Sequence, residues 1–140
     1  MVTVFAWKEE YSVAIPEIDA QHRQLVTILE DLHRAMRKAE GTTVLGSILD
    51  RLQQYAAEHF ATEERLFKKY HYPEEQEHKR EHESFLAKLS SFQKAHGRGE
   101  KLASSELMQF IENWFVDHMQ ATDYRYVPFF QKLGPIAVPR

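Results

Sequence analysis

The chain has 140 residues, of which 43% are hydrophobic and 28% are charged, with only 5 Gly and 5 Pro. This balance is typical of one compact helical domain and excludes a disordered or all-β chain. Because the sequence contains no cysteine, disulfides, iron–sulfur clusters and thiolate zinc sites are excluded as well. The formal net charge of −3 provides no basic surface for nucleic acid or for an anionic membrane.

The N-terminal residues do not form a secretory signal, because no basic stretch is followed by a long apolar run. No apolar run elsewhere is long enough to span a bilayer. We therefore expect a cytoplasmic protein that does not insert into membranes. Within residues 1–16, aromatic residues such as Trp7 and Tyr11 recur in rough alternation up to Pro16. This pattern predicts an extended N-terminal arm that covers a hydrophobic edge of the domain.

A first helix is predicted from about Glu17 to Ala39, where Gly41 follows its end. Residues at helical spacing form its inward stripe, which reads Ile18, His22, Leu25, Leu29, Leu32 and Met36. His33 is almost in phase with His22 but lies about 16 Å further along the helix axis. It cannot share an ion with His22, and we expect it to be an ordinary histidine at the edge of the core.

The second predicted helix follows Thr42 and Thr43, which are suitable N-caps, and runs to about Tyr70. Its inward stripe reads Leu45, Leu49, Leu52, Ala56, His59, Glu63, Leu66 and Tyr70. His59 and Glu63 are the only strongly polar side chains in this stripe. A carboxylate that faces a helical core costs several kcal/mol unless a cation or a full set of hydrogen bonds meets it. The pair therefore predicts that a cation or a full set of hydrogen bonds meets Glu63.

The turn at Tyr72-Pro73 predicts the start of a third helix, because Pro is favoured at the first helical position and acidic residues follow it. Its inward stripe reads His78, His82, Phe85, Leu89 and Phe92. A single histidine in such a stripe is usually an ordinary core residue. Two pairs spaced four residues apart, on two helices, each present both side chains to one face and together predict a metal site.

The fourth predicted helix begins near Ser104, with Leu107, Ile111, Trp114 and His118 inward. Four helices joined by short loops predict an all-α fold, an up-down-up-down antiparallel four-helix bundle. We assign residues 1–140 to a single domain, with an arm (1–16), a bundle (about 17–122) and a short, irregular C-terminal segment (123–140).

The antiparallel topology brings the polar positions of all four helices to the same end of the bundle. His22 opens its helix, His59 and Glu63 lie towards the end of theirs, His78 and His82 open the third, and His118 closes the fourth. Asp123 is an exception, because five residues after His118 is about 140° around a regular helix. It can join the others only if the fourth helix ends or distorts there, and a capping or surface aspartate is the alternative.

Five histidines and two carboxylates are too many ligands for one ion and suit two. Imidazole and carboxylate together favour a transition metal such as iron. If both carboxylates bridge the ions with one solvent oxygen, a coordination position stays open on the ion that has fewer histidines. A small ligand would bind there.

These residues resemble the hemerythrin family, in its single-domain bacterial form, over nearly the whole chain. The matching features are Trp7, the segment Ile18-Asp19-Ala20-Gln21-His22, His59xxxGlu63, Tyr72-Pro73, His78xxxHis82 and His118xxxxAsp123. The resemblance implies two iron ions with an oxo or hydroxo bridge, which bind dioxygen reversibly. It also implies the ligand roles, with His78, His82 and His118 on one iron, His22 and His59 on the other, where dioxygen binds, and Glu63 and Asp123 as bridges.

Four hydrophobic residues lie within about a turn of these ligands and could form a dry oxygen pocket that limits proton access: Leu25, Phe60, Trp114 and Phe115. Ordinary core packing is the alternative for each of them. We expect few acids near the site that could donate protons.

Two other functions compete with an oxygen carrier that stores, transports or delivers dioxygen. A di-iron oxidase or peroxidase of the carboxylate type uses inward Glu-x-x-His pairs, which this sequence lacks, so an enzyme is not expected. A sensor would respond to oxygen or redox state through a partner. The expected partners of a carrier are dioxygen itself and an oxygen-consuming enzyme or a reductase. Iron storage and a closed structural zinc site fit the ligand set less well.

Overall fold

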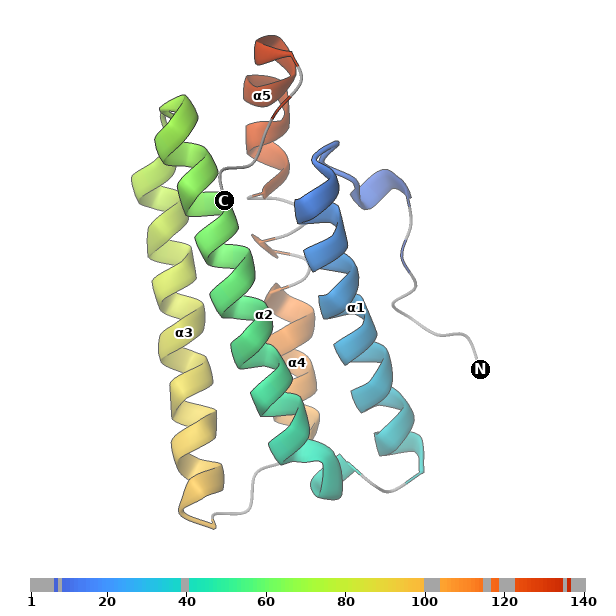
Figure 1. The fold of residues 1–140 in the computed structure, drawn as a ribbon. Coiled ribbons are helices and arrows are strands. Elements are labelled where there is room, and N and C mark those ends of the chain that lie inside the picture. Colours follow the sequence, from blue (N-terminus) through green and yellow to red (C-terminus); the bar gives the residue numbers. More distant parts are fainter. Residues whose placement is uncertain are drawn as a thin grey trace.

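The structure is a computed structural model that describes residues 7, 9–38, 41–99, 104–114, 117–118, 123–134 and 136. Its elements are all helical, in the order η1 (Glu9–Tyr11), α1 (Pro16–Arg37), α2 (Gly41–Tyr70), α3 (Glu75–Gly97), α4 (Ser104–Trp114), η3 (Asp123–Tyr126) and α5 (Val127–Leu133). Helices α1 to α4 run alternately up and down beside one another, and α5 extends from the end of the bundle where α1 begins (Figure 1). The predicted antiparallel bundle is confirmed.

Helix α1 begins at Pro16, where a fixed φ suits the first turn, and the residues before it are held by a side chain within the helix. The Asp19 carboxylate accepts hydrogen bonds from Ser12 Oγ at 2.5 Å and from the Val13 amide at 2.9 Å. Because Asp19 is buried, its carboxylate needs hydrogen-bond partners, and these two bonds provide them. A residue of the first helix therefore fixes the position of the chain segment that leads into it.

The turn between α2 and α3 differs from the prediction that Pro73 is the first helical residue. Helix α3 begins two residues later, at Glu75, with Glu74 at its cap. His71 has a positive φ of 56°, and the backbone amide of Tyr72 bonds back to the Phe67 carbonyl at 3.0 Å. The chain uses Pro73 and Glu74 to complete this reversal before α3 can begin. The acidic residues predicted for the first turn of α3 are present, since Glu75 and Glu77 lie there.

The C-terminal segment was predicted to be irregular, and this prediction is wrong. Residues Val127–Leu133 form helix α5, with Pro128 in its first turn and Gly134, at φ 82°, ending it. Val127 and Phe130, three residues apart, are both buried. A helix this short is not stable alone, so the burial of this face explains why it forms.

The N-terminal arm agrees in part with its prediction. Trp7 and Tyr11 pack against the core and contact each other edge to face at 5.7 Å, and Arg23 of α1 lies over the Trp7 ring at 4.7 Å. Glu9–Tyr11 form the short helix η1 rather than extended chain. Residues 1–6 lie outside the described residues, and the assignment of residues 1–140 to one domain stays a prediction.

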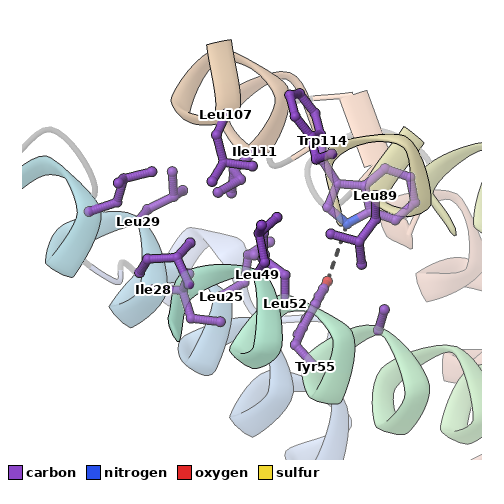
Figure 2. Packing of buried hydrophobic residues seen from close by; sticks show 14 of the residues in the cluster. Leu25, Ile28, Leu29, Leu49, Leu52, Tyr55, Leu89, Leu107, Ile111 and Trp114 are labelled. Atoms are coloured by element: carbon purple, nitrogen blue, oxygen red, sulfur yellow. Dashed lines mark hydrogen bonds between the residues drawn. The ribbon is translucent and has the colours of Figure 1, made fainter. Parts of the chain in front are cut away.

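The buried hydrophobic residues form two clusters. The first, which we call the apolar cluster, fills most of the bundle, and Figure 2 shows its side chains meeting from α1, α2, α3 and α4. Members labelled there are Leu25, Ile28, Leu29, Leu49, Leu52, Tyr55, Leu89, Leu107, Ile111 and Trp114. The second, the aromatic cluster, lies at the α5 end and contains Val13, Ile15, Ile18, Leu66, Phe67, Tyr72, Tyr126, Val127 and Phe130. Within the described ranges, no helix is both long and apolar enough to cross a membrane.

Candidate metal centre

The structure brings together all seven residues that the sequence predicts as ligands. They come from α1, α2, α3, residues 117–118 and η3, and they are among the most deeply buried polar side chains of the chain. Each exposes 2% of its surface or less: His22, His59, Glu63, His78, His82, His118 and Asp123. Buried charges and imidazoles at this density require partners or a cation.

The seven side chains divide into two overlapping groups that could each hold a metal ion. One group contains Glu63, His78, His82 and His118, and the other contains His22, His59, Glu63 and Asp123. Within each group the ligand atoms lie within 4.8 Å of one another. Glu63 belongs to both groups, so the two metal positions adjoin and share a carboxylate.

The Asp123 carboxylate spans the two groups through its two oxygens. Oδ2 lies 2.8 Å from His22 Nε2 and 3.4 Å from His59 Nε2. Oδ1 lies 2.8 Å from Nε2 of both His78 and His118. Each oxygen therefore faces the histidines of a different group, which is the arrangement of a bridging carboxylate.

The helical spacing left the position of Asp123 open, and the local backbone explains how it reaches the site. Regular α4 ends at Trp114, residues 117–118 have π-helical geometry, and Asp123–Tyr126 form the 3-10 turn η3. A π turn and a 3-10 turn both change the angle between successive side chains from that of an α-helix. His118 and Asp123 can therefore both point inward.

Glu63 contacts histidines of both groups with one carboxylate oxygen and a tyrosine with the other oxygen. Oε1 lies 3.2 Å from Nε2 of His59, 3.1 Å from that of His78 and 3.0 Å from that of His82. Oε2 accepts a hydrogen bond from the Tyr126 hydroxyl at 2.8 Å. The tyrosine, three residues after Asp123, thus fixes the orientation of the shared carboxylate and was missed by the sequence analysis.

The surroundings of both carboxylates favour their ionised forms. Burial and the charge of Asp123 would raise the pKa of Glu63, but the imidazoles of His59 and His78 outweigh them and hold this pKa well below its usual value. Burial likewise opposes ionisation of Asp123, but His118 and its neighbours hold the pKa of that carboxyl well below its usual value. The site therefore offers two anionic ligands.

The histidines respond to the same charges in different directions. Burial alone would lower the pKa of His78, but Glu63 and Asp123 raise it to about 9. The pKa of His118 is also raised, since Asp123 outweighs the effect of its burial. For His59 burial wins, and its pKa is lowered. Protons on the imidazoles thus balance the carboxylates, and metal cations would replace those protons.

Several of the buried nitrogen and oxygen atoms that point into the site have no hydrogen-bond partner in the described ranges, as expected of atoms that bind a metal ion. Nε2 of His59, Nε2 of His118 and Oδ1 of Asp123 have no hydrogen-bond partner among the described residues, although the last two lie 2.8 Å apart. Buried polar atoms are normally paired, so such orphans require an explanation. Ligand atoms that converge on a cation face one another in this way.

The family model described as the hemerythrin HHE cation binding domain matches residues 13–130. This chain belongs to the hemerythrin family. It is similar to the bacteriohemerythrin of Stenotrophomonas maltophilia, with 30% identity over 89% of this chain and 80% of the relative. It is also similar to the bacteriohemerythrins of Clostridium acetobutylicum, at 29% identity over 89% of this chain and 99% of the relative, and of Pseudomonas aeruginosa, at 29% over 86% and 78%.

Three of the candidate ligand rings have hydrogen-bond partners on Nδ1, the ring nitrogen that faces away from the site. His59 Nδ1 lies 3.0 Å from Gln21 Oε1, and His82 Nδ1 lies 2.9 Å from Glu64 Oε2. His118 Nδ1 lies 3.3 Å from Glu81 Oε1. Since these oxygens only accept, Nδ1 carries the proton in each ring, which leaves Nε2 able to bind a metal.

Two of the outer partners are acids. We expected few acids near the site that could donate protons. Glu64 and Glu81 each contact a candidate ligand ring, but as acceptors on its outer nitrogen, so the expectation about proton donors stays a prediction. Each of the three outer partners adjoins a predicted ligand in sequence, as Gln21 precedes His22. Adjacency alone does not predict which ring a side chain will contact on another helix, so the sequence carried no usable signal.

Two of the four predicted pocket residues stack directly on ligand rings. Phe60 lies parallel to His82 at 3.9 Å between centroids, and Trp114 lies parallel to His118 at 3.9 Å. Leu25 is fully buried in the apolar cluster. Phe115 lies outside the described residues, and its role stays a prediction.

Tyr55 is a further aromatic neighbour that the sequence analysis missed. It stacks on His59 at 5.3 Å, and its hydroxyl accepts a hydrogen bond from Trp114 Nε1 at 3.3 Å (Figure 2). Its position four residues before His59, on the same helix face, was the available signal. The tyrosine and tryptophan together close the site towards the apolar cluster.

Proposed function

We propose that this chain binds dioxygen reversibly at a non-haem di-iron centre, and that it stores, transports or delivers dioxygen rather than catalysing a reaction. The observation that carries the proposal is the pair of adjoining ligand groups that share Glu63 and are spanned by Asp123. A ligand set of five imidazoles and two carboxylates suits iron and adds only the two negative charges of the carboxylates.

The geometry supports a definite assignment of roles. His78, His82 and His118 would hold one iron, and His22 and His59 the other. Glu63 and Asp123 would bridge the two ions beside an oxo or hydroxo group. When bound, the iron pair supplies the two electrons that dioxygen takes up and returns on release.

The residues around the site would keep water and protons away. Phe60 and Trp114 cover the faces of His82 and His118, and Tyr55 covers His59. A dry environment limits the loss of reduced oxygen species and so favours release of intact dioxygen. Leu25 and Phe115 would complete this oxygen pocket.

A di-iron oxidase or peroxidase is the second candidate, because Glu64 and Glu81 bring carboxylates close to the ligand rings. Both carboxylates contact Nδ1, on the outer side of the rings, and so do not face the position of a bound ligand. A sensor that acts through a partner would use the same chemistry.

An oxygen-consuming enzyme or a reductase would be the expected partner of a carrier. A cytoplasmic location stays a prediction.

An optical spectrum of anaerobically reduced, iron-loaded protein tests the proposal. We expect a visible charge-transfer band to appear in air and to disappear on argon sparging without added reductant. A band that decays to a ferric form, which only a reductant can reset, would instead support an oxidase or a sensor. No band under any condition would contradict the di-iron proposal.

His118→Ala tests the ligand assignment, and His96→Ala is its matched control. His96 is exposed and lies beside Gly46, at the start of α2 and the opposite end of the bundle. We expect His118→Ala to lose bound iron and colour, and His96→Ala to retain both. Full iron content and a normal spectrum in His118→Ala would show that the assignment is wrong.

A further inference from the structure

The outer partners of the ligand rings are not equivalent in charge. In the group of three histidines, His82 and His118 each contact a carboxylate, from Glu64 and Glu81. In the group of two, His59 contacts the neutral amide of Gln21. Nδ1 of His22 is buried and has no hydrogen-bond partner in the part of the chain that the structure describes.

The identity of the Gln21 atom that faces His59 follows from a chain of hydrogen bonds. The Thr62 hydroxyl donates to the Glu58 carbonyl at 2.8 Å, so its oxygen is free to accept. Gln21 Nε2 donates to that oxygen at 2.8 Å, which turns Gln21 Oε1 towards His59 Nδ1. His59 is therefore held as the Nδ1–H tautomer by a neutral acceptor.

A carboxylate and an amide act differently on a metal-bound imidazole. A hydrogen bond from Nδ1–H to an anion raises the basicity of the ring and its donation through Nε2. Charge-assisted bonds of this kind are about twice as strong as bonds between neutral groups. Glu64 and Glu81 keep 36% and 33% of their side-chain surface exposed, so solvent weakens their effect without removing the contact.

We propose that Glu64 and Glu81 make the two metal positions electronically unequal, so that the position held by His78, His82 and His118 favours the ferric state more than the position held by His22 and His59. Gln21 keeps the second position less electron-rich, which favours return of electrons and release of a small ligand there. Glu64, Glu81 and Gln21 are positioning residues that act through the ligand rings. The inference rests on the proposed di-iron function.

Exchanging the charges between the two sides tests the inference. Glu64→Gln and Glu81→Gln place a neutral acceptor where the chain has an anion, and Gln21→Glu does the reverse. Glu83→Gln is the matched control, because Glu83 is an exposed residue of α3 that adjoins His82. Gln21→Leu, which removes the acceptor altogether, is the second variant if Gln21→Glu does not fold.

Potentiometric titration of the iron-loaded protein provides the first readout. We expect each Glu→Gln variant to raise the midpoint potential, with a tenfold change in the ferric-to-ferrous ratio corresponding to about 59 mV for one electron. We expect Gln21→Glu to lower it and Gln21→Leu to raise it. Glu83→Gln should leave it unchanged.

Anaerobic competition with an iron chelator and Mössbauer spectroscopy provide readouts that do not depend on dioxygen. The Glu→Gln variants should bind iron about 10 to 100 times more weakly at one position. They should change the quadrupole doublet of one iron, and Gln21→Glu should change that of the other. Equal shifts in Glu64→Gln, Glu81→Gln and Glu83→Gln, or a shift of the same sign in Gln21→Glu, would overturn the inference.

The two proposals fail in different ways. A wild-type protein that binds two irons but takes up no dioxygen would refute the proposed function, while the variant affinities and doublets would still decide the inference. Reversible dioxygen uptake with no difference between the two sides would refute the inference alone. A wild-type protein that binds no iron would refute both.

Discussion

The two ends of the bundle are stabilised in different ways. The apolar cluster is built almost entirely from hydrophobic side chains, and among its described residues a hydrogen bond between two side chains joins Trp114 to Tyr55 (Figure 2). The candidate metal centre, between that cluster and the aromatic cluster, buries seven polar side chains. The first region needs only burial, whereas the second needs protons or metal ions to balance its carboxylates. Metal binding at the candidate centre would therefore be coupled to folding, whereas the apolar cluster would be stable without it.

Glu63→Ala should have the largest effect, because Glu63 belongs to both ligand groups. We expect loss of both irons, and with each iron about 4 kcal/mol of stabilisation when free iron stands at a thousand times its dissociation constant. Iron analysis and thermal unfolding with and without ferrous iron measure this. Retention of two irons per chain would contradict the shared-ligand assignment.

Leu52→Ala tests the apolar end. Leu52 is fully buried, so its truncation leaves a cavity and should lower the free energy of unfolding by about 2 to 5 kcal/mol. Because no metal contributes there, the loss should be equal in iron-free and iron-loaded protein. Denaturant unfolding of both forms measures it, and a change in iron content would show that the two ends are coupled after all.

The pH dependence of stability should differ between iron-free and iron-loaded protein. The pKa of His78 is raised from 6.5 to about 9, so its contribution is complete below about pH 6.5 and is lost as pH rises through 9. His118, with a raised pKa, adds to this loss of stability at high pH. His59 has a lowered pKa, so its contribution has the opposite sign and is lost as pH falls from neutral into the acid range.

Urea unfolding between pH 6.5 and 9.5 measures this difference. We expect the iron-free protein to lose stability as pH rises, while the iron-loaded protein does not, because its ring nitrogens bind metal instead of protons. Glu63 and Asp123, whose pKa values are lowered, should make both forms less stable as pH falls through the acid range. Identical profiles from pH 6.5 to 9.5 would argue against metal at these histidines.

Tyr126→Phe should have the smallest effect of the four. It removes one buried hydrogen bond, from the Tyr126 hydroxyl to Glu63, and should cost about 0.5 to 1.5 kcal/mol. Tyr124→Phe, at a residue that is 44% exposed, is the matched control and should cost nothing measurable. Thermal unfolding and the visible spectrum of the loaded protein compare them, and equal effects would remove Tyr126 from the site.

Much of the fold was predictable because helical periodicity is a local property. The repeat of three and four residues identified the inward faces of α1, α2 and α3, including His59 and Glu63. The start of α3 and the existence of α5 were not predictable in this way. The first depends on how a reversal at His71 is completed, and the second on a short apolar face that finds a surface to cover.

By itself, the sequence determined which residues face the core, their order along four helices, and therefore the end of the bundle where five histidines meet. Helical spacing left open whether Asp123 reaches them, and the tertiary structure shows that it does. Only the tertiary structure decided that Glu64, Glu81 and Gln21 contact particular rings. The reason is physical. Side-chain spacing along one helix follows from its pitch, whereas contacts between helices depend on their rotation, their offset and the rotamers chosen on packing.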